Sequence, residues 1–287
     1  MNLNLFFHKI YSSFLKRSGT KNNKKNRQSW LDKKYNNHPL ISFIIQSHNK
    51  SLEVKYIVSK LRLVPDSEII VIDDGSKHTH TKIISSFLQG TNEFMIRAND
   101  LYENIMYDRA IRFANGKYIA LLQDDNDFDN LQWVNDAIHY FSKYSGLAIL
   151  GGREGFNFEI IADDTANYTP YKKDEIRKDF SFVHNVNRPP MWINKELFVK
   201  KLKNIDFNFA PFQYDDCELC LRAWLNGLQV GWYNAGFKSL SAGGMRIWNT
   251  LFTREQCAHN QKLLYDMYKD KKEILDNLVD ESNHKLI

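Results

Sequence analysis

The sequence has few cysteines, and their spacing excludes two common kinds of structural site. Only three occur in 287 residues: Cys217, Cys220 and Cys257. They are too few and too irregularly placed for a disulfide framework, and Cys217 and Cys220 have no second pair that would complete a zinc site. We therefore expect free thiols on helices and a reducing compartment.

Long hydrophobic runs are missing from the N-terminal region, which is instead basic. Residues 1–37 contain nine Lys or Arg against the single Asp32, so the other 250 residues carry about −3 of the total charge of +5. The apolar part of residues 1–15 is too short and too interrupted to span a bilayer, and it lacks a signal-peptide core and cleavage site. Five apolar residues nevertheless recur at helical spacing: Leu3, Phe6, Phe7, Ile10 and Phe14.

This tail predicts an amphipathic helix suited to an anionic membrane surface, followed by a basic, Asn-rich stretch. A solvated leader or a targeting peptide is an alternative for the same residues. Nucleic acid is not an expected partner, because the rest of the sequence shows no matching basic face. We expect a cytoplasmic protein without a transmembrane helix, at most peripheral on a membrane through residues 1–37.

The folded part is expected to begin near residue 39 with alternating strands and helices. Because 43% of the chain is hydrophobic and 14% aromatic, it can bury one large core or two fused halves. A strand, a helix and a second strand within about thirty residues form a βαβ unit and predict a parallel sheet. No Gly-x-Gly-x-x-Gly motif follows the first strand, which argues against a dinucleotide dehydrogenase. The expected strands are residues 39–46, 68–72, 93–96 and 118–122, and the expected helices are 54–61 and 103–114.

An acidic cluster follows the apolar strand that begins at Tyr118. The run reads Gln-Asp-Asp-Asn-Asp over residues 123–127. Open α/β folds place ligands at the carboxyl ends of their strands, and carboxylates there suit a divalent metal that carries a phosphate. An acidic loop before a helix near Asp129 is the alternative. A calcium loop is disfavoured, because Asn130 stands where that loop needs Gly and Asp136 where it needs Glu.

Asp73 and Asp74 close the second expected strand and are followed by Gly75. The same location rule makes them candidates to accept hydrogen bonds from a nucleoside base and ribose. A tight turn is the alternative, because Asp and Gly favour turns.

The second half is less regular. A helix is expected over 131–141, a strand over 147–150, a polar, loop-rich insertion over 153–178, and a last helix over 253–268 before a solvent-exposed charged end. Asp215 and Asp216 precede a helix, where acidic residues act as caps and favour the positive end of the helix dipole.

Four blocks in this order resemble glycosyltransferase family 2, whose members have the GT-A fold. The similarity covers roughly residues 40 to 245, and the order of the blocks is more specific than any single one. The blocks are Ser42–Asn49, Glu68–Ser76, Ala114–Asn126 and Tyr214–Gly227.

The resemblance implies an α/β protein with a mostly parallel, Rossmann-like sheet in one catalytic domain over residues 39–245. Residues 39–127 would form the nucleotide-sugar half and 128–245 the acceptor half, between an N-terminal tail (1–38) and a C-terminal helical extension (246–287). The implied reaction is an inverting transfer from a UDP-, GDP- or dTDP-sugar to a hydroxyl of a glycan, glycolipid or glycoprotein, as in polysaccharide biosynthesis.

The resemblance also implies a metal site for Mn²⁺ or Mg²⁺. The Asp-x-Asp motif of the family is here Gln123-Asp124-Asp125, so Asp125 falls on the principal metal ligand and Gln stands in place of the first Asp. Asp124 or Asp127 would compensate in part. A His ligand often found in relatives is missing from residues 237–244. The implied nucleotide-sugar ligands are Ser47, His48, Asp73, Asp74, Gln123 and Asp124.

In the last block Asp216 matches the family's general base, and we expect the start of a helix to keep its pKa low. Asp215 takes the position of the Glu beside it, and Arg222 would brace the helix. Trp192 and Asp215 are further candidates for acceptor contact or support. Trp192 could stack on a sugar, with a position in the core as the alternative. A non-catalytic GT-A domain that binds a glycan or protein is the alternative, motivated by Gln123 and the missing His; a nucleotidyltransferase is a weaker one.

Overall fold

The computed structural model describes Leu3 and residues 5–14, 34–162, 164–171, 179–239 and 250–286. The chain divides into two compact units, residues 1–36 and 37–287. In the first unit residues 5–14 are helical with exposed side chains, as the apolar spacing predicts. The described helices include none with the length and apolar character needed to cross a membrane.

The larger unit alternates strands and helices in its first half and is more irregular in its second. The strands are β1 Ile41–Ser47, β2 Ser67–Asp74, β3 Glu93–Ala98, β4 Tyr118–Gln123, β5 Asn126–Asp127, β6 Leu147–Gly151, β7 Gly155–Ala162, β8 Thr165–Pro170, β9 Phe180–Phe182, β10 Asn185–Val186, β11 Met191–Asn194, β12 Gln229–Tyr233 and β13 Lys238–Ser239. The helices are α2 Ser51–Leu61, α3 His78–Phe87, α4 Tyr102–Phe113, α5 Gln132–Lys143, α6 Lys195–Leu197, η1 Phe198–Leu202, η2 Phe207–Phe209, α7 Asp215–Leu225, α8 Thr250–Tyr268, η3 Lys269–Lys271 and α9 Lys272–His284.

The central sheet has eight strands in the order β3-β2-β1-β4-β11-β6-β12-β9. The strands β3, β2, β1 and β4 are mutually parallel, whereas β11 runs antiparallel to both of its neighbours. The register sets Ser47 opposite Asp73 and Gln46 opposite Gln123. The expected mostly parallel α/β sheet is therefore confirmed, and its register brings the polar ends of three strands to one edge.

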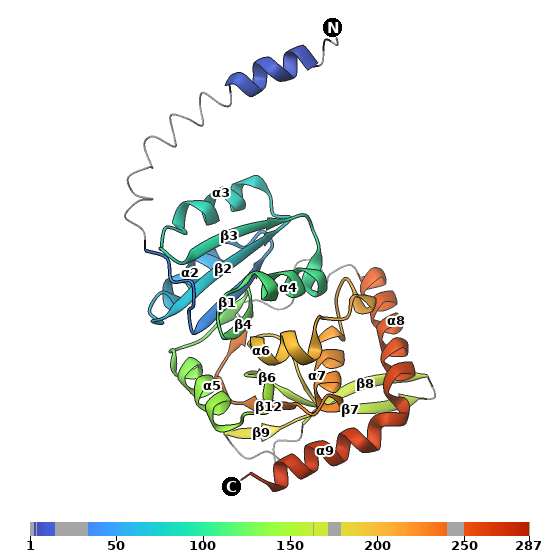
Figure 1. The fold of residues 1–287 in the computed structure, drawn as a ribbon. Helices are drawn as coiled ribbons and strands as arrows, with labels where there is room; N and C mark the ends of the chain where they lie inside the picture. The colour runs from blue at the N-terminus through green and yellow to red at the C-terminus, as the bar shows by residue number, and fades with distance from the viewer. Residues whose placement is uncertain are drawn as a thin grey trace. The chain divides into compact units, whose positions relative to one another are not determined.

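Helices cover both faces of this sheet. The chain steps from β1 to β3 in one direction and returns to β4 in the other, so right-handed crossovers place α4 on the face opposite α2 and α3. Figure 1 shows α4, α6 and α7 in front of the sheet. The α4 helix is followed by Gly116, where a Cβ would lie 2.4 Å from the Ser42 amide nitrogen. Close approach to β1, and not a left-handed helix cap, is the reason for this glycine.

Two predictions for the second half are wrong. Residues 155–170 form the antiparallel hairpin of β7 and β8, where a loop-rich insertion was expected. The charged C-terminal end is the helix α9, which packs with Leu275 and Val279 buried, so this end is not fully exposed to solvent. In both segments buried apolar residues recur at regular spacing among polar ones, Phe156 and Phe158 in β7 and Leu275 and Val279 in α9.

His184 connects this C-terminal helix to the body of the unit. Its Nε2 lies 2.9 Å from the Asp276 carboxylate of α9, and burial lowers its pKa to about 4. A pKa below the ordinary value of about 6.5 means that protonation favours the unfolded chain. We expect the free energy of unfolding to fall by up to about 3 kcal/mol as the pH drops from 6.5 to 4.

Urea unfolding between pH 7 and pH 4.5 measures this loss. The His184→Asn variant should lose less stability than the wild type over that interval, with His139→Asn as a control. An identical pH dependence in wild type and His184→Asn would contradict the assignment.

Candidate active site

The parallel strands β1, β2 and β4 bring polar side chains together at their carboxyl ends. Ser47 and Asp73 are fully buried neighbours, and Thr81 of α3 donates a 2.6 Å hydrogen bond to Asp73 Oδ2. The Ser47 hydroxyl and Asp73 Oδ1 have no hydrogen-bond partner in the described part of the chain. Because buried polar atoms are normally paired, a donor and an acceptor side by side form a candidate contact for a ligand.

Asp74 has a different role in the structure. Its two carboxylate oxygens accept hydrogen bonds from the Leu101 and Tyr102 amides, at 2.8 and 2.9 Å. His48 Nδ1 in turn donates to the Asp74 carbonyl at 2.7 Å. Asp74 thus fixes the start of α4 beside the strand edge.

Asp124 follows β4 and is held by the end of β1. Its carboxylate accepts a 2.8 Å hydrogen bond from the His48 amide and lies 3.4 Å from Lys50 Nζ. Burial raises the pKa of Asp124, and Asp125 adds to this, while the His48 amide and Lys50 lower it. Lys50 is itself buried, which places a cation next to the expected diphosphate site.

The residues around Asp125 fit a metal that is held largely by its substrate. Among the residues that the structure describes, no group of three or more His, Cys, Asp or Glu could hold an ion. Gln123 is directed to Glu103, 2.9 Å away, and Asp127 lies 3.2 Å from Lys60 on α2. Asp125 is buried and supplies one carboxylate. Mg²⁺ is commonly bound by one or two carboxylates together with water and the phosphates of the substrate.

Asp216 lies in the first turn of α7 and is half-buried. The helix is preceded by Gln213 and Tyr214, both with positive φ. Burial, reinforced by Asp215, raises the pKa of Asp216 to about 6, although Arg188 and the Cys217 amide act in the opposite direction. The expectation of a low pKa is therefore wrong, because desolvation outweighs the helix start.

Arg188 joins the two carboxylate groups into one site. Its Nη2 donates to Asp215 Oδ1 at 2.8 Å, and both side chains are buried. Its guanidinium carbon lies 4.9 Å from the centre of the Tyr107 ring, and the Tyr107 hydroxyl donates to the Leu122 carbonyl of β4 at 2.8 Å. Asp215 and its neighbour Asp216 are thus linked to the strand β4, which Asp124 and Asp125 follow directly.

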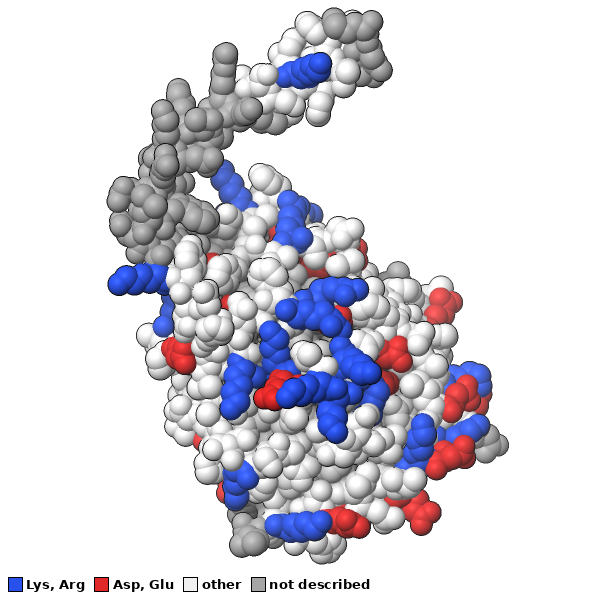
Figure 2. All heavy atoms as spheres, viewed as in Figure 1, with Lys and Arg blue, Asp and Glu red and all other residues white. Residues whose placement is uncertain are grey.

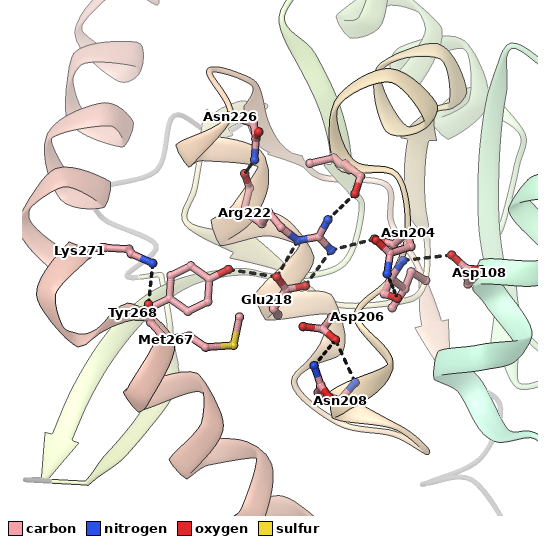
Figure 3. A network of polar contacts seen from close by, with 12 residues as sticks. Asp108, Asn204, Asp206, Asn208, Glu218, Arg222, Asn226, Met267, Tyr268 and Lys271 are labelled. Carbon is pink, nitrogen blue, oxygen red and sulfur yellow. Dashed lines mark hydrogen bonds and ion pairs between the residues drawn. The ribbon is translucent and has the colours of Figure 1, made fainter.

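Arg222 braces the other end of α7. It forms a two-point ion pair with Glu218 and donates to the Leu202 and Asn204 carbonyls, while Tyr268 of α8 donates to the same Glu218 at 3.1 Å (Figure 3). A second link comes from Asn260, whose amide reaches the carbonyls of Phe209, Phe212 and Gln213. The helix α8 therefore holds the turn that precedes Asp216.

Trp192 does not reach the site. Its side chain is fully buried, donates to the Tyr233 hydroxyl at 3.0 Å and packs on Phe43 and Trp133. The proposal that it stacks on a sugar is wrong, and its alternative, a core position, is confirmed. Lys50, Arg188 and Asn260 were not identified from the sequence, because a single Lys, Arg or Asn carries no local signal of its partners.

The chain matches the model of the glycosyl transferase family 2 over residues 42–225. It belongs to this family. The glycosyltransferase class and the GT-A fold expected from the sequence are thereby confirmed.

Three relatives illustrate the similarity. An uncharacterised glycosyltransferase of Methanocaldococcus jannaschii is 24% identical over 64% of this chain, and the chondroitin synthase of Pasteurella multocida is 24% identical over 80%. A dolichyl-phosphate β-glucosyltransferase of Dictyostelium discoideum is 28% identical over 39%. The chain spans 65%, 25% and 33% of the lengths of these proteins, respectively.

Solved structures show the same fold. S. aureus TarS in complex with UDP-GlcNAc has a TM-score of 0.60 at 14% identity, covering 84% of this chain and 70% of that one. GalNAc-T7 with UDP, GalNAc and Mn²⁺ has a TM-score of 0.57 at 14% identity, covering 69% of this chain and 43% of that one.

Proposed function

We propose that this family 2 glycosyltransferase transfers a sugar from a nucleoside diphosphate to an acceptor hydroxyl, with inversion at the anomeric carbon. The observation that carries the proposal is one site with two parts. Asp73, Asp124 and Asp125 lie at the strand edge, and Asp216 is tied to them through the Arg188 and Tyr107 contacts. A direct displacement requires a sugar donor, here at the edge of the sheet, and a general base beside it.

The donor nucleoside is assigned to Ser47 and Asp73. Their unpartnered hydroxyl and carboxylate oxygen match a base that presents an acceptor beside an N–H, as a uracil does. UDP is therefore the first nucleotide to test, and the relatives solved with UDP or UDP-GlcNAc support that choice. His48 and Asp74 hold the surrounding loops.

The first test is thermal unfolding with UDP, GDP, dTDP and CDP, each with and without Mn²⁺. A nucleotide at 100 times its Kd stabilises the protein by about 2.7 kcal/mol. We expect UDP to raise the unfolding temperature, and Asp73→Asn to lose most of that shift because it replaces an acceptor by a donor. The exposed Asp129→Asn serves as the control. If UDP raised the unfolding temperature of Asp73→Asn as much as that of the wild type, the assignment of Asp73 to the nucleobase would be contradicted.

Asp125 is proposed to hold Mn²⁺ or Mg²⁺ together with the diphosphate. The metal would supply Lewis-acid stabilisation of the charge that develops on the leaving nucleoside diphosphate. Lys50 lies near the same position and can add positive charge. Gln123 donates a hydrogen bond to Glu103 and is assigned a supporting role in the donor site, not a role as a metal ligand.

Asp216 is proposed as the general base. A carboxylate with a pKa near 6 is largely ionised at neutral pH, yet more basic than an ordinary Asp. It can accept the proton of the acceptor hydroxyl while that oxygen attacks the anomeric carbon. Arg188 pairs with the neighbouring Asp215 and holds it in place, so that Asp216 is the carboxylate left for the acceptor.

The acceptor is proposed to be a glycan or a glycolipid, as the names of the chondroitin synthase and the dolichyl-phosphate glucosyltransferase suggest. The exposed apolar helix at residues 5–14 and the basic residues after it would hold the enzyme on an anionic membrane.

A non-catalytic GT-A domain is the second candidate. It is favoured by Gln123 in the metal motif and by the absence of a three-residue ligand group among the described residues. Failure of all four nucleotides to stabilise the protein would support it.

A further inference from the structure

A basic and apolar surface of the folded unit is not used by the proposed reaction. It joins the second half of α4 to the segment that follows β11. Six exposed Lys or Arg side chains form this basic patch: Arg109, Arg112, Lys117, Lys200, Lys201 and Lys203. Figure 2 shows Lys and Arg gathered on the middle of the visible face, where Figure 1 places α4 and α6.

The two segments are fixed to each other, so the patch is a single surface. Arg112 donates to the Lys203 carbonyl, and the Lys195 amide donates to the Lys117 carbonyl at 3.1 Å. The Ile205 amide donates to Asp108 at 3.1 Å. The patch therefore has the rigidity of the sheet on which α4 packs.

Acidic residues neutralise this surface only in part. Asp108 is buried and pairs with Arg112 at 3.0 Å and with Arg109 at 3.7 Å, and Asp206 accepts from the Asn208 amide. Glu196 is the exposed carboxylate here, and it pairs with Lys200 at 2.6 Å. A clear excess of positive charge remains.

Large apolar side chains lie among these cations. Phe113 is 56% exposed, Val199 49% and Phe207 37%, and the Arg109 guanidinium lies 5.3 Å from the Phe207 ring. Cations around exposed apolar side chains suit the boundary of a bilayer, where the cations contact lipid phosphates and the apolar groups enter the acyl region. A nucleic acid duplex would contact the cations through its phosphates and offer no apolar region for Phe113 and Val199.

We propose that the basic patch docks the folded unit on an anionic lipid bilayer. Within the folded unit, the patch residue Lys117 is fixed to the start of the first strand, because its amide donates to the Pro39 carbonyl at 3.4 Å. Stable attachment of a peripheral protein takes two weak signals, and the chain supplies them as the helix of residues 5–14 and this patch. Lys117 and Gln123 bracket β4, about 20 Å apart, so docking leaves the donor edge open.

Flotation of the full chain with vesicles tests the proposal. The vesicles are pure phosphatidylcholine or an equimolar mixture with phosphatidylglycerol. Binding is expected to the mixed vesicles only and to weaken with salt. The triple variant K200Q/K201Q/K203Q should bind on the order of a hundredfold less, since each cation near the surface contributes separately.

The matched control is K262Q/K269Q/K271Q, which removes three exposed lysines from α8 and η3 and should bind as the wild type does. Thermal unfolding and the UDP shift of each variant show whether fold and donor site are intact. Phe6→Ser/Phe7→Ser tests the tail separately. The proposal is overturned if only the tail variant loses vesicle binding, or if the two lysine variants lose it equally. It is also overturned if the wild type binds no vesicles but binds a polyanion such as RNA.

Discussion

The Asp216→Asn variant is expected to bind the donor nucleotide as tightly as the wild type but to transfer sugar far more slowly. Asn keeps the size of the side chain and cannot take up the acceptor proton, and positioned general bases contribute on the order of 10²–10⁴-fold to rate. Single-turnover transfer from the UDP-sugar selected by thermal shift measures the loss. Transfer at the wild-type rate by Asp216→Asn would remove this residue from the mechanism.

The pH dependence of the wild type gives a second measure of the same group. Because the base acts in its ionised form and its pKa is raised to about 6, kcat/KM should fall as the pH drops below 6. The Asp215→Asn variant should move this limb to lower pH. It removes a negative neighbour that raises the pKa of Asp216 and leaves the Arg188 charge that lowers it. An unchanged limb in Asp215→Asn would assign the titration to another group.

The strands of the first half could be predicted from sequence because their signals are local, whereas the helix α3 was not predicted. Strands buried on both faces are continuous apolar runs, such as Ile41–Ser47 and Ser67–Asp74. The rule that ligands bind at the carboxyl ends of parallel strands then placed Asp73 and Asp125 on one edge without any knowledge of contacts.

Prediction of the second half failed where it depended on tertiary contacts or on a weaker pattern of apolar residues. In β7 the buried Phe156 and Phe158 alternate with polar residues, a signal obscured by the charged surroundings. The pKa of Asp216 depends on Arg188, 28 positions away, and on burial that the helix start alone does not show. A pKa that depends on partners so far away in the sequence can be assigned only from the structure.

The Arg188→Met variant is expected to lose about 3–5 kcal/mol of unfolding free energy, because it leaves Asp215 buried without its cation. For a chain of this size the unfolding temperature should fall by roughly 10 °C. Thermal and urea unfolding at pH 7.5 measure both effects.

Two comparisons separate charge from packing. Lys238→Met breaks an ion pair with Asp129 in which the two side chains are 67% and 74% exposed, and should cost under about 1 kcal/mol. The double variant Arg188→Met/Asp215→Leu removes both charges and should recover much of the stability, but none of the activity if the pair positions Asp216. A double variant as unstable as Arg188→Met would show that the packing of Arg188 on Tyr107, and not its charge, holds this part of the site together.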